Sequence, residues 1–139
     1  MLALPLLLSG RAMTVPFIHT AGRGLQGDPP AAWLMPLIGD AVIGVSALWI
    51  AWLLSRRSGL WVWVSVIAWN VVAIWDALAA WIVQTTAPWP EFFMLRAVGT
   101  PMFLAASLMH ATIIVLAARP EVRASLIGAP RTHAATAAS

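Results

Sequence analysis

Three long apolar segments alternate with short polar ones along this chain. They cover residues 33–54, 60–83 and 93–118. A helix needs about 20 residues to cross the roughly 30 Å hydrocarbon core of a bilayer, and each segment reaches that length. Backbone groups inside a bilayer must bond to one another, so helices are expected despite the many Val, Ile and Trp residues. The pattern predicts an all-α integral membrane helical bundle with three transmembrane helices.

The connections between these segments also fit a bundle. "SRRSG" is short and polar, so the first two spans should be antiparallel neighbours, and "QTTAPWPE" contains two prolines that favour a turn. Most tryptophans lie near the predicted span ends, as in an aromatic belt. Trp69 and Trp75 lie deeper, and we expect them to pack between helices.

The N-terminal residues 1–22 allow three interpretations. They are apolar, but Arg11 interrupts them and Pro5 and Pro16 favour bends. A signal peptide, a peripheral or re-entrant segment, and a fourth transmembrane span over about residues 2–18 are all open, and we favour the fourth span. Residues 1–120 then form one transmembrane domain. Residues 121–139 end in small and polar residues and are expected to be a disordered tail.

Arginine placement predicts the orientation. The Arg56–Arg57 pair and the C-terminal region lie on the same side of the predicted bundle and hold five of the eight arginines, whereas the connection over residues 84–91 has none. Basic residues favour the cytoplasmic side of a membrane. We therefore expect a multi-pass protein of the cell (inner) membrane with a cytoplasmic C-terminus.

Composition supports a lipid environment and excludes several classes of protein. The chain is 61% hydrophobic and 9% charged, whereas a soluble domain carries about 25% charged residues. Without cysteine it cannot form disulfides or thiolate metal sites. The basic residues are scattered and form no stripe, which argues against nucleic-acid binding.

Five polar residues inside the predicted spans form the candidate site. Asp40 shares a face with Gly44, Ala47 and Ala51, within about 60° at 100° per residue. Small residues on such a face let a second helix approach closely. We expect an intramembrane polar layer, structural or functional, in which an arginine bridges the two aspartates and the amide bonds to the histidine. Its members are Asp40, Asn70, Asp76, Arg96 and His110. Arg96 is the expected bridge, and Arg11 is a second partner if residues 2–18 span.

Specific chemistry is weakly indicated. No catalytic, phosphate-binding or metal-ligand spacing is present, and the single serines in apolar helices are typical of backbone hydrogen bonding. His110 lacks a second histidine at a suitable depth for haem, because His19 and His133 lie toward the helix ends or in the tail. No catalytic residue, metal or cofactor is therefore predicted.

The segments "LIGDAVIGVSAL", "WNVVAIWDALAAWIV" and "FLAASLMHATIIVL" carry a resemblance. Their Gly-Asp, Trp-Asn, Asp and His positions resemble a loosely defined family of uncharacterised bacterial multi-pass integral membrane proteins. The matching positions are Gly39 and Asp40, Trp69 and Asn70, Asp76, and His110. The resemblance implies a fold and these polar positions, and it implies no reaction.

Three classes of function remain open from the sequence. The first is a non-enzymatic membrane component or accessory subunit, which the small-residue faces favour. The second is an oligomeric small transporter or channel using Asp40, Asp76 and His110. The third is a haem- or quinone-binding redox membrane protein. The expected partners are the lipid bilayer and either further copies of the chain or a partner membrane subunit.

Overall fold

The computed structural model describes residues 9–128, apart from the side chain of Phe93. Eight helical elements follow one another along this part of the chain, and no strand is found within it. They are η1 (Ser9–Thr14), α2 (Val15–Ile18), η2 (Ala31–Trp33), α3 (Leu34–Arg56), α4 (Leu60–Thr86), α5 (Phe93–Val98), α6 (Pro101–Ala118) and α7 (Pro120–Ile127).

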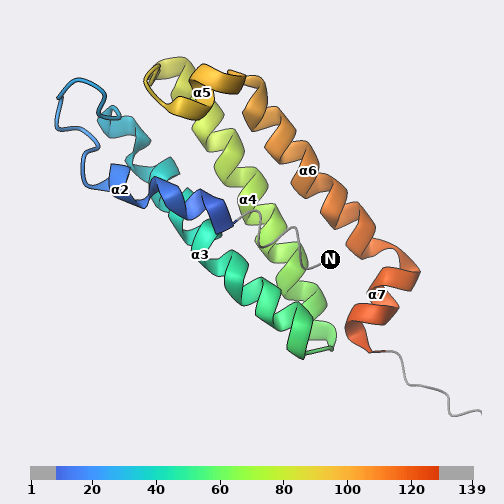
Figure 1. The fold of residues 1–139 in the computed structure, drawn as a ribbon. Coiled ribbons are helices and arrows are strands. Elements are labelled where there is room, and N and C mark those ends of the chain that lie inside the picture. The colour runs from blue at the N-terminus through green and yellow to red at the C-terminus, as the bar shows by residue number, and fades with distance from the viewer. Residues whose placement is uncertain (1–8, 129–139) are drawn as a thin grey trace, which may run out of the picture.

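Three long helices lie side by side and form the bundle (Figure 1). The segments Ala31–Arg56, Leu60–Thr86 and Pro101–Ala118 are each long and apolar enough to cross a membrane. Their outward faces carry large apolar side chains, as expected for helices that face lipid. Among the most exposed are Val45, Trp49, Trp61, Trp75, Ile82, Leu108 and Val115. The predicted class, an all-α membrane bundle with three transmembrane helices, is confirmed.

Small residues line the contacts between the helices. On α3, Gly44, Ala47 and Ala51 are buried, as the predicted face requires, and Ala47 is 0% exposed. On α4, which lies between α3 and α6 (Figure 1), Ala73 and Ala77 are buried in the same way. Small side chains allow the backbones to approach closely, which strengthens packing where lipid provides no hydrophobic driving force between helices.

The N-terminal segment packs across α3 (Figure 1). A side chain at Gly44 would collide with the backbone of Arg11 and Ala12, so η1 lies directly on the α3 helix at this glycine. Residues 9–18 extend about 18 Å as one 3₁₀ and one α-helical piece, which is shorter than the bilayer core. The described part of the expected fourth span is therefore a short segment on α3, and residues 2–8 lie outside the described residues.

The third predicted span is interrupted. We expected one helix over residues 93–118, but the chain divides it into α5 and α6 at Gly99 and Thr100. Gly99 has a φ of +76°, which favours glycine, and Pro101 opens α6 without an N–H to donate to the preceding turn. The apolar pattern continues through this break, so hydrophobicity alone could not locate it.

Two further predictions were wrong in detail. Trp75 is 75% exposed on the outer face of α4, whereas Trp69 does pack inward and donates its indole N–H to Ser46 Oγ at 2.9 Å. The start of the predicted disordered tail is the helix α7, which Pro120 opens. This helix returns to the bundle, where Leu126 O accepts a hydrogen bond from Gly59 N at 2.9 Å. Residues 129–139 of the predicted tail lie outside the described residues.

Candidate functional site

An arginine from the N-terminal segment joins the two intramembrane aspartates. Arg11 Nη2 forms ion pairs with Asp40 Oδ1 on α3 and, at 2.8 Å, with Asp76 Oδ2 on α4. Arg11 Nε also donates to Asp40 Oδ1. The three side chains are 19%, 24% and 10% exposed, in that order. We call this group the ion cluster. It connects three elements that are distant in the sequence.

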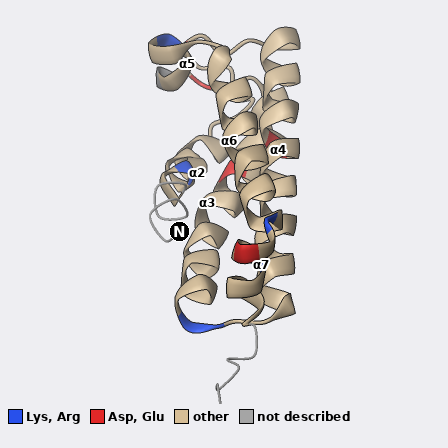
Figure 2. Ribbon diagram, turned by 90° about the vertical axis from the view of Figure 1, so that its right-hand side faces the viewer, with Lys and Arg blue, Asp and Glu red and all other residues tan. Residues whose placement is uncertain are grey.

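Arg96 is not the bridge that the sequence analysis expected. Arg96 is exposed and belongs to α5, which the break at Gly99 separates from α6. Figure 2 shows α5 at one end of the molecule, level with the end of a neighbouring long helix. The prediction placed Arg96 by counting residues along one continuous helix, and that helix does not exist. Arg11, the second partner in the prediction, takes this role alone.

Gly39 explains why the two aspartates can meet. A Cβ atom at Gly39 would collide with the Asp76 carboxylate, so only glycine permits this approach of α4 to α3. The adjacent residue Asp40 then presents the second carboxylate to Arg11. The Gly-Asp pair noted in the sequence thus has a steric reason. Gly39 makes the close contact with α4, and the next residue of α3, Asp40, makes the ionic contact with Arg11.

Asn70 and His110 form a second, separate polar pair. His110 Nδ1 lies 2.8 Å from Asn70 Oδ1, and Asn70 Nδ2 donates to Val66 O at 2.7 Å. Because Oδ1 is an acceptor, His110 Nδ1 is the donor in this bond. Both side chains are buried, and the expected hydrogen bond is confirmed. His110 Nε2 is also buried and has no hydrogen-bond partner among the described residues.

A cavity of about 420 Å³ lies beside the ion cluster. Its walls come from η1, η2, from all the α-helices α2 to α6, and from the connection between α4 and α5. They are mainly aromatic, methionine and alanine side chains. Arg11 and Asp40 are the charged residues that line it. The cavity size falls within the range of about 300–1,000 Å³ that is typical of small-molecule sites.

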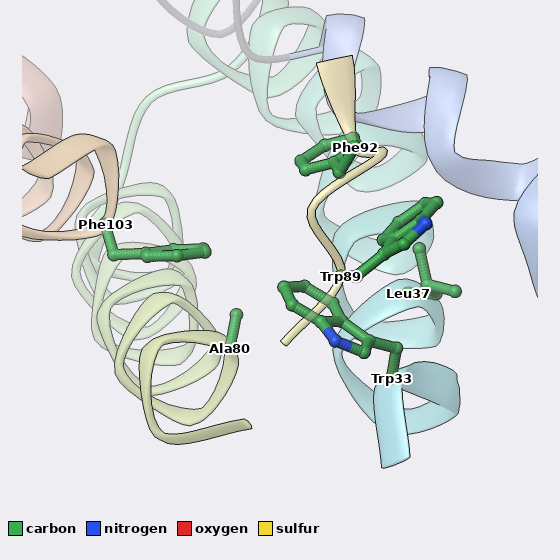
Figure 3. Packing of buried hydrophobic residues seen from close by; sticks show 6 residues of the cluster. All are labelled: Trp33, Leu37, Ala80, Trp89, Phe92 and Phe103. Atoms are coloured by element: carbon green, nitrogen blue, oxygen red, sulfur yellow. The ribbon is translucent and has the colours of Figure 1, made fainter. Parts of the chain in front are cut away.

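Aromatic side chains that lie close to one another form part of the cavity wall (Figure 3). Trp89 stacks on Phe92 with ring centres 4.9 Å apart, and Trp33 meets Trp89 edge-on at 5.6 Å. Phe103 completes the group from α6, with its ring centre 6.4 Å from that of Trp33. The indole N–H groups are already used, since Trp33 Nε1 donates to Ala87 O and Trp89 Nε1 to Gly27 O. The aromatic wall therefore offers ring surfaces rather than hydrogen bonds.

The sequence analysis found part of this site. It placed Asp40 with Asp76 and Asn70 with His110, and the structure brings both pairs together. It treated Trp33 and Trp89 only as belt residues and missed the cavity that they line. The available signal was the aromatic content of "PWPEFF" in a proline-containing connection, where no apolar helix face requires it. Among the described residues, no group of three His, Cys, Asp or Glu could hold a metal ion.

The fold and site define an all-α integral membrane bundle with an ion cluster beside an apolar cavity. In comparisons with known proteins, no family model, no curated protein and no solved structure matches this chain. The resemblance to bacterial multi-pass membrane proteins therefore stays a prediction, and function must be argued from the site itself.

Replacing Arg11 should destabilise the protein far more than replacing Arg96. Arg11→Gln leaves two partly buried carboxylates without their cation, and breaking a buried ion pair costs about 3–5 kcal/mol. Arg96→Gln, the matched control, alters an exposed side chain and should leave the unfolding temperature unchanged within about 2 °C, since exposed substitutions change stability by under about 0.5 kcal/mol. The measurement is thermal unfolding of both variants in mild detergent. Equal losses in the two variants would show that Arg11 is not the bridge.

Proposed function

We propose that this chain is a non-enzymatic membrane protein that binds a small lipid-soluble molecule in the cavity beside the ion cluster. The observation that carries this proposal is the cavity of about 420 Å³ with aromatic walls and a charged end. Concave, mainly apolar sites with a few placed polar groups are typical of ligand binding. The lining offers one charged pair and no nucleophile with a neighbouring base, which favours binding over catalysis.

The cavity distinguishes this proposal from the other classes. A haem needs an axial ligand, and His110 does not line the cavity. The transporter alternative uses Asp40, Asp76 and His110 on one path, whereas His110 is hydrogen-bonded to Asn70 in a separate pair. Within the accessory-subunit class, a bound lipid-soluble molecule gives the chain a specific role that bundle packing alone would not.

Binding should depend on the space inside the cavity. Ala106 lines it from α6, so Ala106→Phe should fill part of the volume and weaken binding about tenfold or more. Leu108→Phe changes an exposed residue of the same helix and serves as the matched control. The measurement is saturable fluorescence of the neutral probe aminoanthracene with purified protein in mild detergent. Organic extracts of the same preparations, examined by mass spectrometry, should contain a molecule that Ala106→Phe loses.

Two results would contradict the proposal. The first is no saturable binding of aminoanthracene and no co-purifying molecule in the natural sequence. The second is equal binding by the natural sequence and the Ala106→Phe variant when circular dichroism shows that both are folded.

We further propose that the end of the bundle with the α3–α4 turn and α7 faces the cytoplasm of a bacterial cell. Four arginines lie there, at positions 56, 57, 119 and 123, together with Glu121 (Figure 2). At the opposite end, Arg23 and Arg96 are matched by Asp28 and Glu91. The excess of arginine at one end supports this orientation because basic residues favour the cytoplasmic side.

The orientation can be tested with a single introduced cysteine, because the chain has none of its own. Ser58→Cys places a thiol in the exposed α3–α4 turn. A membrane-impermeant maleimide should label it in inside-out vesicles and leave it unlabelled in intact spheroplasts. Gln26→Cys, in the exposed loop at the other end, is the control and should show the reverse pattern. Labelling of Ser58→Cys in spheroplasts would contradict the orientation.

A further inference from the structure

The charge of the ion cluster is unbalanced, and this limits what the cavity can hold. Two carboxylates, Asp40 and Asp76, face one guanidinium, Arg11. The cluster therefore carries one formal negative charge in excess when both carboxylates are ionised. An uncompensated charge inside a bilayer is unfavourable. A positive group at the cavity would remove that cost, and an anion would add to it.

Asp40 is the carboxylate that faces the cavity. It lines the cavity wall, whereas Asp76 does not, and its side chain is the more exposed of the two. Arg11 makes both of its contacts with Asp40 through Oδ1. Oδ2 is not engaged by the guanidinium. A ligand N–H that reaches Oδ2 would therefore not have to displace Arg11, although Asp40 also interacts with the Asp76 carboxyl.

The remaining polar groups of the wall offer little to any other ligand. Thr14 Oγ1 donates to Arg11 O at 2.8 Å, and the two tryptophan N–H groups are bonded to backbone carbonyls. Arg11 Nη1 is buried and has no hydrogen-bond partner among the described residues, but the guanidinium it belongs to is already paired with both carboxylates. The lining thus combines one accessible carboxylate with apolar and aromatic surface.

The aromatic wall suits the apolar body of such a ligand. Trp33, Trp89, Phe92 and Phe103 line the cavity and lie close to one another (Figure 3). The same rings pack against an apolar ligand body. The Asp40 carboxylate thus binds the positive end of a ligand, and the rings pack against its apolar body.

We propose that the ligands of this cavity are lipophilic cations, namely molecules with an apolar or aromatic body and one protonated amine. This inference rests on the proposed binding function and adds the charge of the ligand. The amine donates to Asp40, neutralises the cluster, and leaves its apolar body against the aromatic wall. Affinity should therefore fall in the order amine, alcohol, carboxylate for molecules with the same body.

The test is competition against bound aminoanthracene by phenylbutylamine, phenylbutanol and phenylbutyrate, each corrected for its partition into empty micelles. Phenylbutylamine should compete about tenfold or more better than phenylbutanol, and phenylbutyrate should be the weakest. A tenfold difference corresponds to about 1.4 kcal/mol. In Asp40→Asn, which balances the cluster, the preference for the amine should disappear while aminoanthracene still binds.

The outcomes separate this inference from the proposed function. If aminoanthracene does not bind the natural sequence, the binding function itself fails. If aminoanthracene binds but phenylbutanol competes as well as phenylbutylamine, a proton or a small inorganic cation balances the cluster and the inference is overturned. A preference for phenylbutyrate over the other two competitors would also overturn the inference. The order of competition is measured on the natural sequence, so it decides the inference even if Asp40→Asn does not fold.

Discussion

The ion cluster of Arg11, Asp40 and Asp76 is the interaction on which the rest of this structure depends. Charged groups inside a bilayer must be paired, and each of these three comes from a different element. Satisfying the two aspartates therefore fixes η1 against α3 and α4. The close approaches at Gly39 and Gly44 follow from the same requirement, because any side chain there would hold the charged groups apart. At Gly39 and Gly44 of α3, the same close approach serves both helix packing and the pairing of the charged groups.

The cavity is a consequence of this arrangement. With η1 held on α3, the following segment α2 lies beside the bundle and lines the cavity through Phe17. The connection that carries Trp89 and Phe92 lines another part of the cavity. The space enclosed between them has one charged corner and one aromatic wall. Trp33 and Trp89 anchor this wall through hydrogen bonds to backbone carbonyls, so their rings have defined positions. A rigid, preformed site of this kind needs little reorganisation on binding.

Much of the architecture could be predicted from the sequence because hydrophobic length is a strong signal in membranes. The first two spans begin and end within a few residues of α3 and α4, and Asn70 meets His110 as helical periodicity predicts. Gly99 was missed because the residues around it remain apolar, although its combination with Pro101 was a visible breaker. The choice of Arg11 over Arg96 could not be predicted, since it depends on how the N-terminal segment folds back on α3. The helix α7 was missed because its composition is polar, despite Pro120 and Glu121 in its first turn.

The most direct measurement of the central claim is the distance between arginine and aspartate side chains in lipid bilayers. Solid-state NMR on protein with ¹⁵N-arginine and ¹³C-labelled aspartate carboxyls measures it through dipolar coupling. With an Arg11 to Asp76 N···O distance of 2.8 Å, the account predicts a strong coupling, and it should persist in the Arg96→Gln variant. A coupling that is absent, or that disappears only when Arg96 is replaced, would contradict it.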